Sequence, residues 1–162
     1  MSRGLIRSFR GLRRNERGVQ LVELAIVIPL IALLLAAVTE FGRYFYEYTT
    51  LSKGARIATR YLVTARTNGI DDPAAKNLVV YGNLAGTGNP ILSGLSTANV
   101  QITRRDSAGG TVTGGVPNTI TVDIINYPHV SLFNMSGLSG STLNVPVKPS
   151  VTMRYLLTQP PI

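Results

Sequence analysis

The sequence contains no cysteine, no tryptophan and only one histidine, His129, among its 162 residues. Without cysteine, the chain can form neither a disulfide framework nor a thiolate metal site. One histidine is too few for most zinc sites. Asp123, His129 and Ser131 have the residue types of a hydrolase triad, but they are crowded together in the sequence without a nucleophile elbow. We therefore expect a protein that is not an enzyme and holds no cofactor or metal.

Acidic residues are also scarce, at 8 against 16 lysines and arginines, which gives a formal net charge of +8. Much of the positive charge lies before residue 19, where six arginines stand against one glutamate. Lys53, Arg56, Arg60 and Arg66 are spaced along a helical pattern and alternate with apolar positions, as on a solvated helix face. We therefore expect no nucleic-acid partner.

An apolar run covers residues 19–38 and is interrupted only by Gln20 and Glu23. At about 1.5 Å per residue, a helix of this length reaches about 30 Å, the thickness of a bilayer's hydrocarbon core. Residues 24–38 are apolar on every helical face, unlike a surface helix of a soluble domain. The arginines before the run place the N-terminus in the cytoplasm. The sequence thus predicts a basic cytoplasmic leader at 1–18 and a transmembrane helix at 19–39, which Pro29 is expected to kink.

Gly18 ends the basic leader, and Glu23 follows it inside the apolar run. A carboxylate in a membrane span costs roughly 2.5–3.5 kcal/mol on insertion scales and normally marks a partner. Glu23 either pairs with such a partner or lies close enough to the interface to be hydrated. The A-x-A site of a secretory signal peptide is absent after the apolar run.

The arrangement of Arg17, Gly18 and Glu23 resembles the cleavage site of type IV prepilins. The wider segments 16–18, 22–29, 40–43 and 54–56 resemble the TadE-like pseudopilins of the tight-adherence (Flp) pilus system, and residues 150–155 resemble that family's closing strand. Leu24 departs from the pattern, because the family usually has an aromatic residue there. The resemblance implies that a prepilin peptidase cuts between Gly18 and Val19, and that Glu23 pairs with the freed amine of a neighbouring subunit.

Beyond the span, apolar residues recur at steps of three and four and predict that the helix continues to about residue 65. The predicted helix face comprises Phe41, Tyr44, Tyr48, Leu51, Ala55, Ala58, Leu62 and Ala65. Residues 40–66 are therefore expected to form an extracytoplasmic stalk. Aromatic residues at 44–46 and 48 suit either a membrane interface or packing against another pilin-like subunit.

Residues 67–162 predict a small extracytoplasmic α+β domain. Asp72 precedes Pro73 and is expected to cap a short helix at about 73–81. Alternating apolar residues predict antiparallel strands near 100–103, 119–124, 143–147 and 150–155, with Pro146 on an edge strand. The Gly- and Ser-rich connections 82–96, 107–118 and 136–141 are expected to be mobile or to contact partners. The predicted fold is α+β: a long N-terminal transmembrane and stalk helix with a small C-terminal antiparallel sheet, the lollipop shape of pilins.

The sequence therefore predicts a minor pilin or pseudopilin of the bacterial inner membrane that initiates or supports assembly of a tight-adherence type IV pilus. The expected partners are the membrane, the prepilin peptidase and other pilins or pseudopilins, with the C-terminal domain in the periplasm. Incorporation in an extracellular, adhesive pilus is left open. The alternative is an unprocessed single-pass membrane-anchored adaptor or cell-envelope protein, and the N-terminal residue of the mature chain distinguishes the two.

Overall fold

A computed structural model describes residues 16–132 and 145–157, with side chains from Gly18 onward. Its first element is the helix α1 (Glu16–Leu62), 47 residues long, which continues through Pro29. The predicted helix had the same length but was placed three residues too late at each end. The Ala65 N–H donates to the Leu62 carbonyl (3.2 Å), a three-residue step that is typical of a tightened helix terminus.

The chain divides into two compact units between Phe41 and Gly42. In the first unit, the large apolar side chains of α1 are exposed on all its faces, with relative exposures from 38% at Val27 to 76% at Phe41. The predicted leader falls mostly on residues 1–15, which lie outside the described part of the chain.

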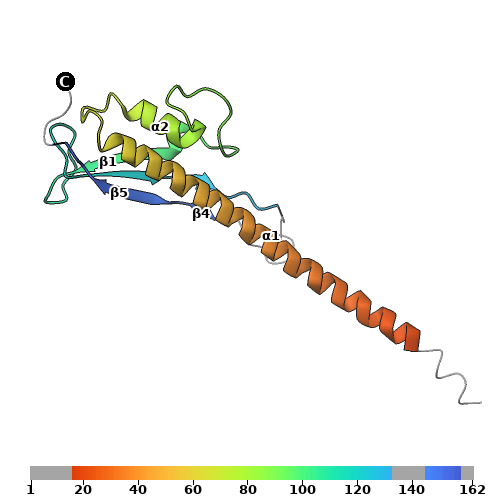
Figure 1. Ribbon diagram of the computed structural model, residues 1–162. Helices are drawn as coiled ribbons and strands as arrows, with labels where there is room; N and C mark the ends of the chain where they lie inside the picture. Colours follow the sequence, from red (N-terminus) through yellow and green to blue (C-terminus); the bar gives the residue numbers. More distant parts are fainter. Residues whose placement is uncertain (1–15, 133–144, 158–162) are drawn as a thin grey trace, which may run out of the picture. The chain divides into compact units, whose positions relative to one another are not determined.

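The second unit contains the rest of α1 and a small α+β arrangement (Figure 1). Its other elements are α2 (Asp72–Tyr81), a 3₁₀ helix η2 (Thr97–Asn99), and the strands β1 (Val100–Arg105), β2 (Thr119–Ile124), β3 (Tyr127–Pro128), β4 (Pro146–Val147) and β5 (Ser150–Arg154). Strands β1, β2 and β5 form an antiparallel sheet in the order β1-β2-β5, and β3 pairs with β4. The predicted α+β class with a small antiparallel sheet is confirmed.

The two faces of the three-stranded sheet differ as the alternating sequence predicts. On one face, Ile120, Val122 and Ile124 of β2 are at most 1% exposed. On the other face, Thr121 lies opposite Thr152 of β5, and their hydroxyl groups are 2.8 Å apart. One face therefore packs against the core while the other meets solvent, as is common in antiparallel sheets.

The core of the second unit is built on the last three turns of α1. The buried apolar residues of this stretch are Leu51, Ala55, Ala58 and Leu62. A Cβ atom at Gly54 would lie 3.4 Å from the backbone of Val79, so α2 packs closely against α1 there. The Thr59 hydroxyl donates to the Ala55 carbonyl (2.7 Å) and reaches the Val151 carbonyl of β5 (3.4 Å).

Some positions of the predicted pattern are wrong. Phe41 and Tyr48 were predicted on the buried helix face, but they are 76% and 42% exposed. The apolar face of α1 is covered fully only from Leu51 onward, where α2 and the sheet begin to pack. The connection after α2 is anchored, because Leu92 and Leu95 are buried in the core. The predicted connection 136–141 and the start of the predicted strand 143–147 lie outside the described residues.

Candidate functional site

Gly18 and Val19, the predicted cleavage residues, are the third and fourth residues of α1. Val19 is 64% exposed, and a Cβ atom at Gly18 would meet nothing within 4 Å. The first four N–H groups of a helix have no partner within the helix. Opening this first turn therefore breaks few hydrogen bonds, which leaves the Gly18–Val19 bond accessible to an enzyme that binds an extended chain.

Glu23 lies one helical turn after Val19, on the same face of α1. Among the residues that the structure describes, no hydrogen bond or ion pair engages its exposed carboxylate. Helical side chains lean toward the N-terminus, so this carboxylate is directed to the turn that contains Val19. The structure thus brings the three predicted site residues together on one end of one helix.

The N-terminal part of α1 has the properties of a membrane anchor. Judged by length and composition, α1 is the one helix among the described residues that could cross a membrane. Its most apolar stretch is not buried. An exposed apolar surface of this extent is unusual on a soluble monomer. The helix therefore fits a single-pass membrane anchor.

A polar cluster that the sequence did not predict lies where α1 enters the second unit. His129 is 2% exposed, and its Nδ1 lies 2.7 Å from Glu47 Oε2. Arg43 Nη2 lies 3.9 Å from the other carboxylate oxygen of Glu47, and Arg43 Nη1 donates to the Val130 carbonyl (3.3 Å). The ring of Tyr44 meets the imidazole edge-on, with centroids 5.5 Å apart. This cluster ties α1 to the segment that follows β3.

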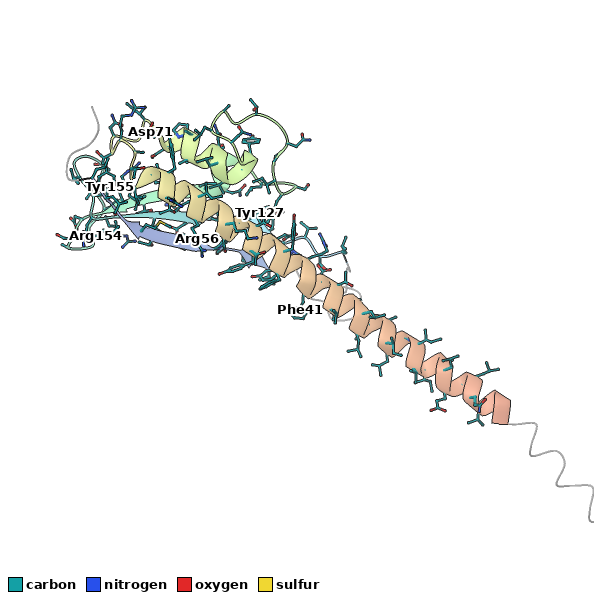
Figure 2. The ribbon with its side chains drawn as sticks, viewed as in Figure 1. Phe41, Arg56, Asp71, Tyr127, Arg154 and Tyr155 are labelled. Atoms are coloured by element: carbon teal, nitrogen blue, oxygen red, sulfur yellow. The ribbon has the colours of Figure 1, made fainter. Side chains whose placement is uncertain are left out.

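Tyr127 of β3, labelled in Figure 2, lies close to the same cluster. Its hydroxyl donates to the Ser93 carbonyl (3.2 Å). Burial, and then the negative charge of Glu47, raise the pKa of Tyr127 above its ordinary value, while Arg43 opposes the shift. Tyr127 therefore stays protonated and acts as a hydrogen-bond donor between β3 and the connection after α2.

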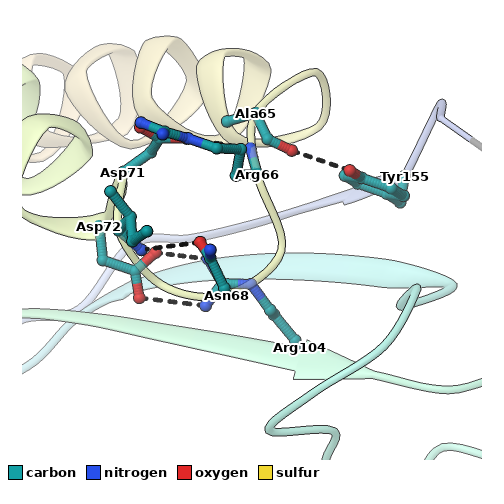
Figure 3. A network of polar contacts seen from close by, with 8 residues as sticks. Ala65, Arg66, Asn68, Asp71, Asp72, Arg104 and Tyr155 are labelled. Atoms are coloured by element: carbon teal, nitrogen blue, oxygen red, sulfur yellow. Dashed lines mark hydrogen bonds and ion pairs between the residues drawn. The ribbon is translucent and has the colours of Figure 1, made fainter. Parts of the chain in front are cut away.

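A second polar cluster closes the other end of the unit (Figure 3). Asp71 accepts hydrogen bonds from the backbone N–H of Arg66 (3.0 Å) and from its guanidinium, where the distance to Nη2 is 2.9 Å. The side-chain hydrogen bond from Arg66 lowers the pKa of Asp71, although burial opposes the shift. The same contact raises the pKa of Arg66. This pair fixes the turn between α1 and α2.

Asp72 is paired with Arg104 of β1 through the two terminal guanidinium nitrogens, Nη1 and Nη2, with a distance of 3.0 Å from Nη1 to Oδ2. The predicted cap is therefore wrong: the residue at the N-cap of α2 is Asp71, and its side chain makes no capping hydrogen bond. Both carboxylates bind arginines instead, because an arginine fork offers a charged pair of donors. Sequence alone could not reveal Arg104 as a partner, since it is 32 residues away.

Tyr155 makes a further contact at this end of the second unit. Its hydroxyl donates to the Ala65 carbonyl (2.8 Å), and the Leu156 N–H donates to the Val63 carbonyl (3.2 Å). Burial raises the pKa of Tyr155. The segment after β5 is thereby joined to the chain just beyond α1, as Figure 3 shows for Tyr155. Both polar clusters thus connect elements that are distant in the sequence.

The fold and these sites define a class of protein: a small α+β domain joined to one long helix whose exposed apolar part fits a membrane anchor. The family model described as TadE-like protein matches residues 18–60. This match confirms the predicted TadE-like resemblance within residues 18–60; it begins at Gly18, ends within α1 and does not extend to residues 150–155. The family suggests a protein associated with the Tad pilus. No curated protein and no solved structure matches this chain.

Proposed function

We propose that the protein is a minor pilin or pseudopilin that initiates or supports assembly of a tight-adherence type IV pilus. The observation that carries the proposal is the family match over residues 18–60 together with the placement of Gly18, Val19 and Glu23 on the exposed end of α1. The arginine-rich leader supports a cytoplasmic N-terminus in the bacterial inner membrane and a periplasmic α+β domain.

In the proposed processing step, a prepilin peptidase hydrolyses the Gly18–Val19 peptide bond and releases the basic leader. The accessible first turn of α1 and the open space at Gly18 support this step. Cleavage leaves the apolar part of α1 at the start of the mature protein, with a new α-amino group on Val19. The anchor therefore stays in the membrane after processing.

The proposed role of Glu23 follows from the free-energy cost of placing its carboxylate in the membrane. A carboxylate in a span is unfavourable by roughly 2.5–3.5 kcal/mol on insertion scales, so a partner cation offsets a substantial penalty. The freed amine of Val19 on a neighbouring subunit supplies this charge in the proposed assembly step. The amine of the same chain is also near, one helical turn away, so an experiment must separate insertion from association.

The substitution Glu23→Gln makes this separation, because it removes the charge and keeps the size. Insertion becomes cheaper, so the membrane level should hold. Loss of a charge-assisted hydrogen bond should weaken subunit association by roughly 1.5–3 kcal/mol, about ten- to a hundredfold. Crosslinking to pilus subunits and pilus production should both fall.

Glu23→Asp serves as the matched control, since it keeps the charge on a shorter side chain and should restore part of the crosslinking. Normal piliation and normal crosslinking of Glu23→Gln would contradict the assembly role and leave Glu23 as a hydrated interfacial residue.

We further propose that the role of the protein is structural rather than catalytic. The paired ionisable groups of the second unit support this, because Glu47 contacts His129 while Asp71 and Asp72 bind Arg66 and Arg104. These pairs hold α1, α2, β1 and the segment after β3 in contact with one another. The alternative function, an unprocessed membrane-anchored adaptor, predicts a mature protein that retains its leader.

A further inference from the structure

The β3–β4 ribbon, defined here as residues 127–132 and 145–147, has an outward face unlike that of the main sheet. Along the ribbon, Tyr127, His129 and Val147 are buried. The exposed positions that alternate with them, and so lie on the outward face, are Pro128, Val130, Leu132 and Pro146; Val145, opposite His129, is exposed at the end of the ribbon. All five are apolar, and Val130, Leu132 and Val145 are 62%, 62% and 49% exposed.

The outward face of the three-stranded sheet is polar by comparison. Its exposed positions are Gln101, Arg105, Ser150, Thr152 and Arg154, beside the half-buried Thr121. Both surfaces belong to the same unit, so the difference is local. A polar outward face suits water, whereas a contiguous apolar face indicates contact with an apolar phase or partner.

Contacts with α1 determine which turns of this helix the ribbon lies beside. His129 contacts Glu47, and the next residue, Val130, accepts a hydrogen bond from Arg43, one turn nearer the N-terminus of α1. The His129 N–H donates to the Val145 carbonyl (3.1 Å), so the second segment of the ribbon lies at the same level. The ribbon therefore runs beside α1 in the direction of the apolar run.

Arg43 follows Val38, the last residue of the apolar run, by five positions on one helix. At the helical rise this is about 7.5 Å. The interfacial layer of a bilayer is roughly 5–8 Å thick on each side of the hydrocarbon core. Because only four residues separate Val38 from Arg43, Arg43 and the ribbon that it binds must lie close to the end of the span. Phe45 and Tyr46, exposed at 67% and 62%, occupy the same turns, and amphipathic rings favour this layer.

We propose that the apolar face of the β3–β4 ribbon is a second membrane contact, seated in the interfacial layer of the bilayer beside the anchor. The occupant of this face is lipid, because Arg43, which binds the ribbon at Val130, follows the last residue of the apolar run by only five positions on one helix. The buried contact between His129 and Glu47 holds the ribbon against α1 at this level. The inference rests on the membrane anchor of the proposed function.

Site-directed fluorescence on the full-length protein tests the proposal, since a chain without cysteine gives clean single labelling. Val130→Cys and Val145→Cys are each labelled with an environment-sensitive fluorophore and reconstituted in bilayers of phosphatidylcholine and phosphatidylglycerol. Both labels should show blue-shifted emission and lose most of their fluorescence when some of the lipid carries a nitroxide on its headgroup.

Two further positions serve as controls. Val116 is an exposed apolar residue (44%) in the connection between β1 and β2. That connection ends beside Tyr155, at the end of the unit remote from Arg43. A label at Val116→Cys should therefore be unaffected. A label at Leu30→Cys, within the span, should be quenched by a nitroxide placed deep in the acyl chain.

The outcomes separate the two proposals. If Leu30 is quenched while positions 130 and 145 behave like position 116, the ribbon contact is wrong and the anchor stands. Blue-shifted but unquenched labels at 130 and 145 would indicate that another protein or a second copy covers the ribbon, which also overturns the proposal. Quenching at position 116 as well would show nonspecific adsorption of the whole domain. An unquenched Leu30 would reject the anchor itself.

Discussion

Glu47 and His129 show how a single contact determines the local structure, because they are 82 residues apart in the sequence and 2.7 Å apart in space. A buried imidazole without a partner would leave a polar group unsatisfied. The carboxylate of Glu47 supplies that partner and also lies near Arg43. The pair therefore decides where the segment after β3 lies on α1.

We expect Glu47→Ala and His129→Ala each to lower the free energy of unfolding by roughly 1.5–3 kcal/mol, since each removes a hydrogen bond to a buried ionisable group. The double variant should lose less than the sum of the single losses, because the two residues act on one contact. Urea unfolding of the detergent-solubilised protein measures all three. Asp123→Asn, whose carboxylate has no hydrogen bond among the described residues, should change stability by less than about 0.5 kcal/mol. Strict additivity would show that the contact is not formed.

Asp71 gives a prediction that depends on pH. Its pKa is lowered from the ordinary value of 3.8 by the hydrogen bond from Arg66. A group whose pKa is lower in the folded state stabilises the fold above its unfolded pKa, and loses this contribution as the pH falls through the folded pKa. The stability difference between the wild type and Asp71→Asn should be constant near neutrality and narrow below pH 3.8.

Thermal unfolding of both proteins across this pH range measures the difference directly, and other carboxylates cancel in the comparison. A gap that stays constant down to the lowest pH would mean that Asp71 contributes through packing rather than through its charge.

At the scale of secondary-structure elements, the close approach of α1 to α2 depends on Gly54. A Cβ atom there would already be 3.4 Å from Val79, so a larger side chain must displace α2. We expect Gly54→Leu to destabilise the second unit by about 1–3 kcal/mol, the usual range for overpacking. Gly42→Ala is the control: it lies on the same helix, has nothing within 4 Å of its Cβ position, and should gain up to about 1 kcal/mol of helix propensity. Equal effects of the two substitutions on the melting temperature would contradict this account of the junction.

The elements were largely predictable from local patterns. The alternation in residues 119–124 predicted β2 at its observed bounds, and the apolar periodicity predicted α1 to within three residues. Strand β3 was missed because two residues, one of them Pro128, are too short for a period-two pattern. Phe41 and Tyr48 fit the helical period but lie outside the covered part of α1, and periodicity carries no information about where a partner element begins.

The candidate site divides in the same way. Gly18, Val19 and Glu23 are close together in the sequence, so the resemblance to the prepilin cleavage site sufficed to group them. The contacts of His129 with Glu47 and of Arg104 with Asp72 join segments 82 and 32 residues apart, and they arise only when the sheet packs on the helices. No local pattern contains this information.

At the scale of the whole molecule, the chain combines an exposed apolar helix with a domain that has its own core and two polar clusters. The apolar part of α1 fits a membrane anchor, while the buried residues from Leu51 onward form a core within the second unit. In the proposed function, the leader sets the direction of insertion, the anchor keeps the chain in the membrane, and the domain contacts the pilus system.

The N-terminal residue of the protein purified from bacterial membranes tests the central claim most directly. Intact-mass and N-terminal analysis should give a chain that begins at Val19 when an active prepilin peptidase is present, and the full 17.4 kDa chain when it is absent. Gly18→Leu should also remain at full length, because a bulky residue replaces the small one at the cleavage site. A wild-type protein that keeps its leader beside an active peptidase, or a Gly18→Leu variant that is shortened normally, would contradict the account.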